Sequence, residues 1–196
     1  MNKIKYVGLD ISTSIIGVSL LDRAGNLVGL ESINLKKINC IFNKSNVVRQ
    51  QFTNFKKKYV FEEELKISVE ESFQSFRSGF SSAKTLSKLN MFNGIVSYIA
   101  SDVYSVIPEY INVNSARKSL QIKIDKKLEK STKDQVFEWV KKDFDENNFL
   151  FDWPEKILKS GPNKGRVKFD ESCYDMSDAY VICKAAIYNE RNINKQ

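Results

Sequence analysis

Two apolar, β-branched runs open the chain and are separated by a short polar break. The first run ends in Asp10, the break follows at residues 12–14, and the second run covers residues 15–21. This pattern predicts a buried strand, a tight turn and a return strand. A third strand is expected at residues 27–35, so that the three strands form an antiparallel meander. Asp10 would then stand at the end of a central strand.

Further along the chain, apolar positions recur at helical spacing. Val48, Phe52, Phe55 and Tyr59 are separated by four, three and four residues, which predicts a helix with one apolar face. Similar spacing predicts helices over residues 82–103, from residue 131 onward, and over residues 174–190. Short apolar runs predict strands at residues 65–69 and 110–113.

The order of these elements is that of the ribonuclease H-like fold, an α/β architecture in which a mixed five-stranded sheet is flanked by helices. The length of 196 residues fits one domain that covers the whole chain, residues 1–196. Residues 145–172 have no clear periodicity and are expected to form a long insertion, and such segments are commonly functional or mobile.

Composition limits the chemistry that this chain can perform. It contains no histidine, which excludes Ser-His-Asp and Cys-His catalysis and removes the commonest transition-metal ligand. A metal ion would have to be held by carboxylates, which suit Mg²⁺ or Mn²⁺. The net charge of +7 favours polyanionic partners, and residues 112–142 hold nine Lys and Arg against four Asp and Glu. No apolar stretch is long enough to predict a membrane span, so a cytoplasmic protein is expected.

Carboxylates stand at the ends of the predicted strands and at the start of the last helix. Asp10 ends the first strand, and Glu70 and Glu71 follow the strand at residues 65–69. Asp175 and Asp178 share one face of the last helix, although helix N-termini favour Asp in any case. Asp10 alone could equally serve a turn, but in the ribonuclease H-like fold all these acids could meet. Four carboxylates without histidine match a two-metal centre for phosphoryl transfer.

The chain resembles the RuvC-like Holliday junction endonucleases, in particular their bacteriophage branch. The resemblance covers nearly the whole chain outside residues 145–172. The motifs that carry it are Gly8-Leu9-Asp10 with Gly17, Val69-Glu70-Glu71-Ser72-Phe73, Asn93-Gly94, Ser131-Thr132-Lys133-Asp134-Gln135-Val136, and Asp175-Met176-Ser177-Asp178-Ala179.

The resemblance implies a homodimer that binds branched DNA, such as Holliday junctions, three-way junctions or replication forks, and nicks it with two Mg²⁺ or Mn²⁺ ions per site. It implies that the metal ligands are Asp10, Glu70, Asp175 and Asp178, and that Lys133 faces a phosphate near them. Glu70 is preferred to Glu71 by position in the motif, because a central strand is buried on both faces and alternation does not separate the two. If phage-encoded, the protein would act in the cytoplasm of a bacterial host.

DNA contacts are expected from the basic segment and from the residues that precede the long helix. The residues assigned to this role are Phe73, Phe76, Arg77, Lys84, Arg117, Lys118 and Lys133. The Phe-rich stretch, which also contains Phe80, is either part of the core or a binding surface. The long helix is expected at the dimer interface because Met91, Phe92, Ile95 and Tyr98 widen its apolar stripe, the alternative being a fully buried core helix.

Two departures from the family pattern bear on specificity. Ile11-Ser12-Thr13 replaces a Gly-containing turn after the first Asp, and the loop after Glu70 is longer. These departures affect the preference for a cleavage sequence and the strictness for four-way junctions.

Alternative functions for the chain are a nuclease for other DNA or RNA–DNA substrates, a non-catalytic protein that binds branched DNA, and an actin-like or sugar-kinase-like ATPase. The ATPase would need two domains and a Gly-rich loop, but the eight glycines are scattered.

Overall fold

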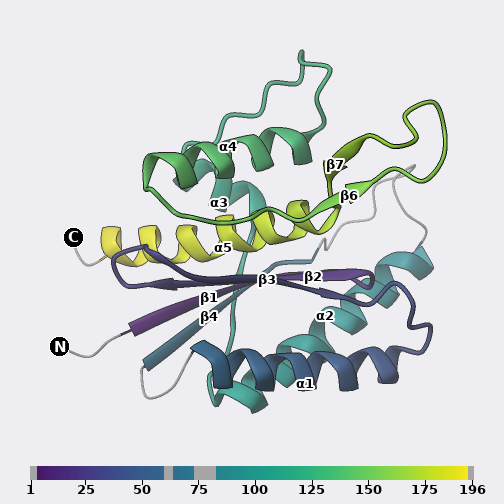
Figure 1. Cartoon of the computed structure of the whole chain (residues 1–196). Helices are drawn as coiled ribbons and strands as arrows, with labels where there is room; N and C mark the ends of the chain where they lie inside the picture. The colour runs from purple at the N-terminus through teal and green to yellow at the C-terminus, as the bar shows by residue number, and fades with distance from the viewer. Residues whose placement is uncertain (1–3, 60–63, 73–82, 194–196) are drawn as a thin grey trace.

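A five-stranded sheet lies between two layers of helices in the computed structural model (Figure 1), which describes residues 4–59, 64–72 and 83–193. The strands are β1 (Ile4–Ile11), β2 (Ile15–Asp22), β3 (Leu27–Asn34), β4 (Glu64–Glu70) and β5 (Glu109–Ile111). Their order across the sheet is β3-β2-β1-β4-β5. The first three strands are antiparallel, whereas β4 runs parallel to β1 and β5 runs parallel to β4. The predicted ribonuclease H-like sheet is therefore confirmed.

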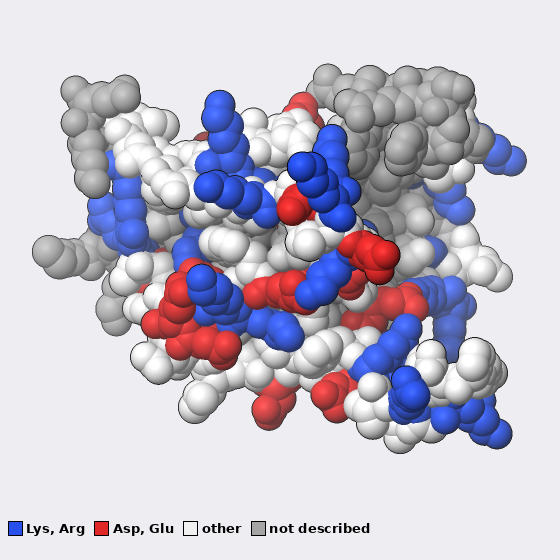
Figure 2. All heavy atoms as spheres, turned by 90° about the horizontal axis from the view of Figure 1, so that it is seen from above, with Lys and Arg blue, Asp and Glu red and all other residues white. Residues whose placement is uncertain are grey.

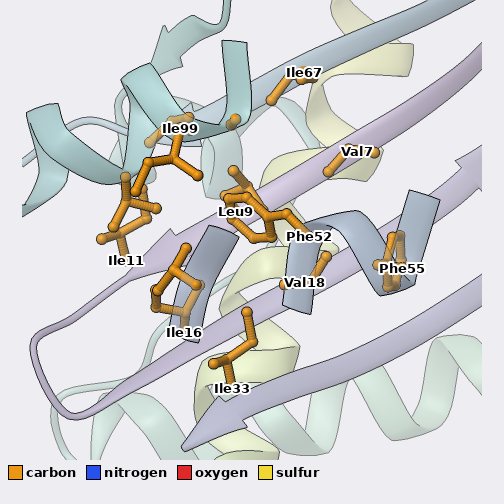
Figure 3. Close-up of a cluster of buried hydrophobic side chains, with 14 of the residues drawn as sticks. Val7, Leu9, Ile11, Ile16, Val18, Ile33, Phe52, Phe55, Ile67 and Ile99 are labelled. Carbon is orange, nitrogen blue, oxygen red and sulfur yellow. The ribbon is translucent and has the colours of Figure 1, made fainter. Parts of the chain in front are cut away.

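One face of the sheet is covered by α1 (Ile41–Tyr59) and α2 (Ala83–Tyr104). Alternate strand residues such as Val7, Leu9 and Ile67 point into this layer and meet Phe52 and Ile99 of the two helices (Figure 3). Burial of these large apolar side chains drives this half of the molecule to fold.

The opposite face is covered by α5 (Ser172–Ile193), with α3 (Val113–Ser119) and α4 (Thr132–Glu146) packed outside it (Figure 1). Small residues let α5 lie directly on the strands. A Cβ atom on Gly8 of β1 would come within 2.2 Å of the Ala179 carbonyl oxygen of α5. An aromatic cluster links α4 and α5, and Phe144 lies at its centre with ring centroids 5.0 Å from Tyr180 and 5.3 Å from Trp153.

The structure differs from the predicted elements in three places. Helix α1 begins at Ile41, earlier than the apolar stripe that starts at Val48, because polar residues 43–46 interrupt the apolar spacing in its first turns. Strand β5 ends at Ile111, and Asn112 caps a short helix, α3, that the sequence analysis did not predict. Residues 145–172 contain a hairpin formed by β6 (Glu155–Ile157) and β7 (Val167–Phe169).

Helix α2 packs on α1 and contributes Phe92 to the core, where this side chain is fully buried. Phe92 was expected to belong to the dimer interface, and that expectation is wrong because its side chain lies in the core.

Among the described residues, every helix is too short or too polar to cross a lipid bilayer.

Candidate functional site

Asp10 lies at the carboxyl end of β1 on the face that α5 covers. Side chains alternate between the two faces of a strand, so Tyr6, Gly8 and Asp10 share one face and Val7 and Leu9 the other. Tyr6 belongs to the core beneath α5, whereas Val7 and Leu9 belong to the core beneath α1 and α2. The alternation therefore directs the Asp10 carboxylate toward α5.

Glu70 stands beside Asp10 at the end of the neighbouring parallel strand. The register pairs Leu9 with Val69, so the next residue of each strand lies at the same level. A side-chain hydrogen bond joins the Glu70 and Asp10 carboxyl groups. The Glu71 side chain instead accepts a hydrogen bond of 3.4 Å from the Asn112 amide at the start of α3.

Asp175 and Asp178 come from the first turns of α5 and are 8% and 7% exposed. Their position depends on Gly17, which pairs with Asp10 across the β1–β2 ladder. A Cβ atom on Gly17 would lie 1.9 Å from the Asp175 carbonyl oxygen, so only glycine lets α5 begin this close to β2. The start of α5 is capped by Asp170, whose carboxylate accepts a 2.9 Å hydrogen bond from the Ser172 amide.

Two cationic side chains approach the four acids from the outer helices. Arg117 of α3 lies with Nη2 3.2 Å from Oδ1 of Asp178. Lys133, in the first turn of α4, is close enough to lower the pKa of Asp10, Glu70, Asp175 and Asp178 alike. Tyr174 holds the starts of α4 and α5 together, because its hydroxyl donates a 2.7 Å hydrogen bond to the Asp134 carboxylate.

Removal from water raises the pKa of each of the four acids. The pKa of Glu70 rises to about 7 and that of Asp175 to about 6. Burial, together with the facing Glu70, Asp178 and Asp175 carboxylates, raises the pKa of Asp10 well above its ordinary range. The pKa of Asp178 is also raised by burial, against the opposing effect of Arg117. The cluster therefore favours the uptake of positive charge, either as protons or as a metal cation.

The donor set fits a hard divalent cation, because all four side chains offer carboxylate oxygens. Within residues 4–59, 64–72 and 83–193, no three acidic or thiol side chains already stand in an arrangement that would hold a metal ion. Instead, the hydrogen bond between Asp10 and Glu70 and the ion pair between Arg117 and Asp178 occupy oxygens that a cation would use.

The remaining predicted DNA contacts are only partly gathered around the acids. Lys84 is exposed in the first turn of α2, and Lys118 is exposed on α3. Arg117, assigned to DNA binding, points into the acid cluster instead. Phe73, Phe76, Phe80 and Arg77 lie outside the described residues. Seen from the α4 side, Lys and Arg are dispersed among Asp and Glu and do not form one patch on this face (Figure 2).

A recess of about 540 Å³ lies beside α3. Its lining includes the cationic side chains of Arg117, Lys118 and Lys123. Arg117 lines this recess and also pairs with Asp178, so the recess and the acid cluster share this side chain.

Comparison with known proteins bears on the fold. No family model and no curated protein matches the chain. The solved structure of Thermus thermophilus RuvC in complex with a Holliday junction substrate matches with a TM-score of 0.61 at 14% sequence identity, over 96% of both chains. The chain has a RuvC-like fold. A second structure of Thermus thermophilus RuvC matches with a TM-score of 0.56 at 15% identity, again over 96% of both chains.

The RuvC-like fold covers nearly the entire chain, so the shared architecture includes β1, β4 and α5, which carry the four acids. At this sequence identity the likeness is one of fold. The roles of individual side chains are predictions from the sequence.

Proposed function

We propose that this protein is a metal-dependent, structure-selective endonuclease that binds branched DNA such as Holliday junctions and nicks it by phosphodiester hydrolysis. The observation that carries this proposal is the convergence of Asp10, Glu70, Asp175 and Asp178 at one edge of a RuvC-like sheet. Support also comes from the matching RuvC structure, which contains a Holliday junction substrate. We also propose that the protein belongs to the bacteriophage branch of the RuvC-like endonucleases.

In this proposal the four acids hold Mg²⁺, or Mn²⁺ in its place, with two ions per site. When bound, such paired cations activate a water molecule and stabilise the charge that develops on the scissile phosphate. Arg117 keeps the Asp178 carboxylate oriented through their ion pair. Lys133 approaches the same centre from α4 and would contact the phosphate, where a fixed cation lowers the barrier to hydrolysis.

DNA would reach the acids along the cationic side chains around them. The recess lined by Arg117, Lys118 and Lys123 and the exposed Lys84 are suited to backbone phosphates, which dominate affinity for DNA without reading its sequence. Phe73, Phe76 and Arg77 precede α2 in the chain and are proposed to approach the branch point, where bases are easily unstacked.

We propose a homodimer because two nicks in strands of like polarity need two active sites, and a two-fold dimer matches the symmetry of a four-way junction. Helix α2 is the proposed interface. Met91 and Tyr98, two turns apart on this helix, are 52% and 68% exposed.

The experiment that tests this function compares DNA structures under identical conditions. Purified protein is incubated with end-labelled four-way, three-way, flap and linear duplex DNA and with an RNA–DNA hybrid, in Mg²⁺ or in EDTA. We expect Mg²⁺-dependent nicks near the branch point of four-way DNA, much slower nicking of linear DNA, and no cleavage in EDTA.

The other outcomes distinguish the alternatives. Equal cleavage of the linear duplex or the hybrid would assign the protein to a different nuclease class on the same fold. Tight binding of branched DNA without cleavage in either Mg²⁺ or Mn²⁺ would make it a non-catalytic junction-binding protein.

A further inference from the structure

The β6–β7 hairpin directly precedes α5, the helix that carries Asp175 and Asp178. Strand β7 ends at Phe169, and α5 begins at Ser172. The base of the hairpin is fixed to the fold, because the Asp170 amide donates a 2.8 Å hydrogen bond to the Pro154 carbonyl oxygen. In addition, the Phe169 ring packs edge-on against Phe137 of α4, with centroids 5.0 Å apart.

The tip of the hairpin is ordered by its own backbone. The Gly165 amide donates a 2.8 Å hydrogen bond to the Leu158 carbonyl oxygen, which closes the loop. Gly161 and Gly165 have φ angles of 81° and 86°, a conformation that favours glycine. The hairpin extends past the start of α5 and away from the sheet (Figure 1).

The hairpin is strongly basic. Residues 155–169 contain five Lys and Arg and a single acid, Glu155. Lys156 is paired with Asp170 and Glu171 at the base. The other four cationic side chains are exposed and form no ion pair with another described residue. They are Lys159, Lys164, Arg166 and Lys168.

The register of the hairpin places two of its cations side by side. Lys156 and Lys168 are directly opposite each other on the two strands. Asp170 and Glu171 compensate the charge of Lys156, whereas Lys168 forms no ion pair with another described residue. A polyanion lying along the hairpin would relieve the repulsion of its unpaired cations.

We propose that the β6–β7 hairpin is a DNA-binding arm that holds the phosphates of the duplex arm leading to the scissile bond. This inference rests on the proposed function. The chain from Gly165 to Asp170 spans at most about 18 Å, and half a turn of B-DNA is about 17 Å. Measured from the start of α5, which carries Asp175 and Asp178, an arm of this length is long enough to contact phosphates up to about half a helical turn away.

The charge of the hairpin decides between DNA and a protein partner. Ile157 and Val167 are cross-strand partners, 64% and 57% exposed, and a protein partner would bury them. Four unpaired cations against the single acid Glu155 match a phosphate backbone better, because each phosphate contact releases condensed counterions.

The test uses two variants that lose the same charge at opposite ends of the molecule. The hairpin variant is Lys159→Gln/Lys164→Gln/Arg166→Gln. The control is Arg23→Gln/Lys57→Gln/Arg191→Gln, with all three side chains exposed near the start of β1. Affinity for four-way and linear DNA is measured in EDTA as a function of salt, and thermal unfolding and sedimentation verify the fold and the oligomeric state.

We expect the slope of log affinity against log salt to become shallower by about two to three units in the hairpin variant. The control should keep the wild-type slope. Hydroxyl-radical footprints should lose protection about half a turn from the branch in the hairpin variant only.

If wild type binds DNA and the hairpin variant has the same slope of log affinity against log salt, the hairpin is not a DNA-binding arm. The proposed function would be unaffected by that result. A hairpin variant that changes oligomeric state without changing the slope would assign the segment to a protein contact and likewise overturn the arm. A wild-type protein that binds no DNA would overturn the proposed function and the arm together.

Discussion

At the residue scale, the raised pKa values of the four acids link metal binding to stability. A carboxyl group whose pKa is higher in the folded protein stabilises the fold while it is protonated, and this contribution is lost as pH rises through the folded-state pKa. The relevant values are about 6 for Asp175 and about 7 for Glu70, against ordinary values of 3.8 and 4.5. The chain has no histidine, so no imidazole titrates in the same range.

We therefore predict that the metal-free protein becomes less stable between pH 5 and pH 8, by on the order of 2 kcal/mol. Thermal unfolding in EDTA across this range measures the effect, and Mg²⁺ should restore stability at pH 8. The Asp10→Asn variant, which removes one of the repelling charges, should show a flatter pH dependence. A wild-type midpoint that is constant or rises from pH 5 to pH 8 would contradict the charge balance described for the cluster.

The adjacent residues Glu70 and Glu71 offer a matched pair of substitutions. Glu70 is hydrogen-bonded to Asp10, whereas Glu71 contacts Asn112. Glu70→Gln should reduce nicking by about a hundredfold or more, because the amide cannot neutralise a cation. Glu71→Gln should stay within a few-fold of wild type in the same cleavage assay. The reverse result would move the ligand by one position.

The four acids could be proposed as a site from their positions in the sequence. The alternation of apolar and polar residues in β4 also distinguishes Glu70 from Glu71, and the sequence analysis did not use it. In β4, Leu65, Ile67 and Val69 alternate with Lys66, Ser68 and Glu70, so Glu70 belongs to the polar face that meets α5. Both faces of β4 are covered by helices, but one face is apolar and the other is polar. Alternation along the strand therefore does separate Glu70 from Glu71. By contrast, the ion pair between Arg117 and Asp178 joins residues far apart in sequence and depends on how α3 packs against α5.

At the element scale, the site depends on the close contact between α5 and the first two strands. Gly17→Ala should push α5 away from β2, because the added methyl group would overlap the Asp175 carbonyl. Overpacking of this kind costs about 1–3 kcal/mol or more, and it should also displace both α5 acids and reduce cleavage.

The control is Gly94→Ala in α2, where no atom of the described residues lies within 4 Å of the added methyl group. This change should raise stability by about 0.5–1 kcal/mol, because alanine favours a helix interior. Urea unfolding of both variants measures the difference. If Gly17→Ala is as stable and as active as wild type, α5 does not require this close contact.

The long elements were predictable because each one carries a strong period, as in α4 with Val136, Val140 and Phe144 on its buried side. Helix α3 is short and lacks such a period, and only the cap at Asn112 indicates where it starts. The hairpin at β6 and β7 was missed because its strands contain three residues each and its outer positions are exposed, so no alternation is visible.

At the scale of the whole molecule, the element order was sufficient for the sheet topology, since few arrangements accommodate a meander followed by parallel crossovers. Quaternary structure is not determined in this way, because a single chain does not reveal which exposed apolar residues meet a partner. Met91 and Tyr98 of α2 are such residues.

We predict that wild-type protein sediments as a dimer at micromolar concentration, and that Met91→Lys/Tyr98→Glu shifts it toward monomer with little change in thermal stability. Introducing charge into a dimer interface is unfavourable, whereas both positions are exposed in the single chain. Tyr188→Glu, an exposed residue on α5, is the matched control and should leave the dimer intact. A wild-type monomer at micromolar concentration and with DNA present would contradict the dimer.

In the proposed function, the acids gathered at the ends of β1 and β4 and at the start of α5 perform metal-dependent cleavage of branched DNA. Its most direct test is the single-turnover rate at which wild type and Asp10→Asn nick a labelled four-way junction in saturating Mg²⁺, with both proteins bound to the DNA. We predict nicking by wild type and a rate lower by about a hundredfold or more for Asp10→Asn, with DNA affinity nearly unchanged. Equal rates for the two proteins would contradict it.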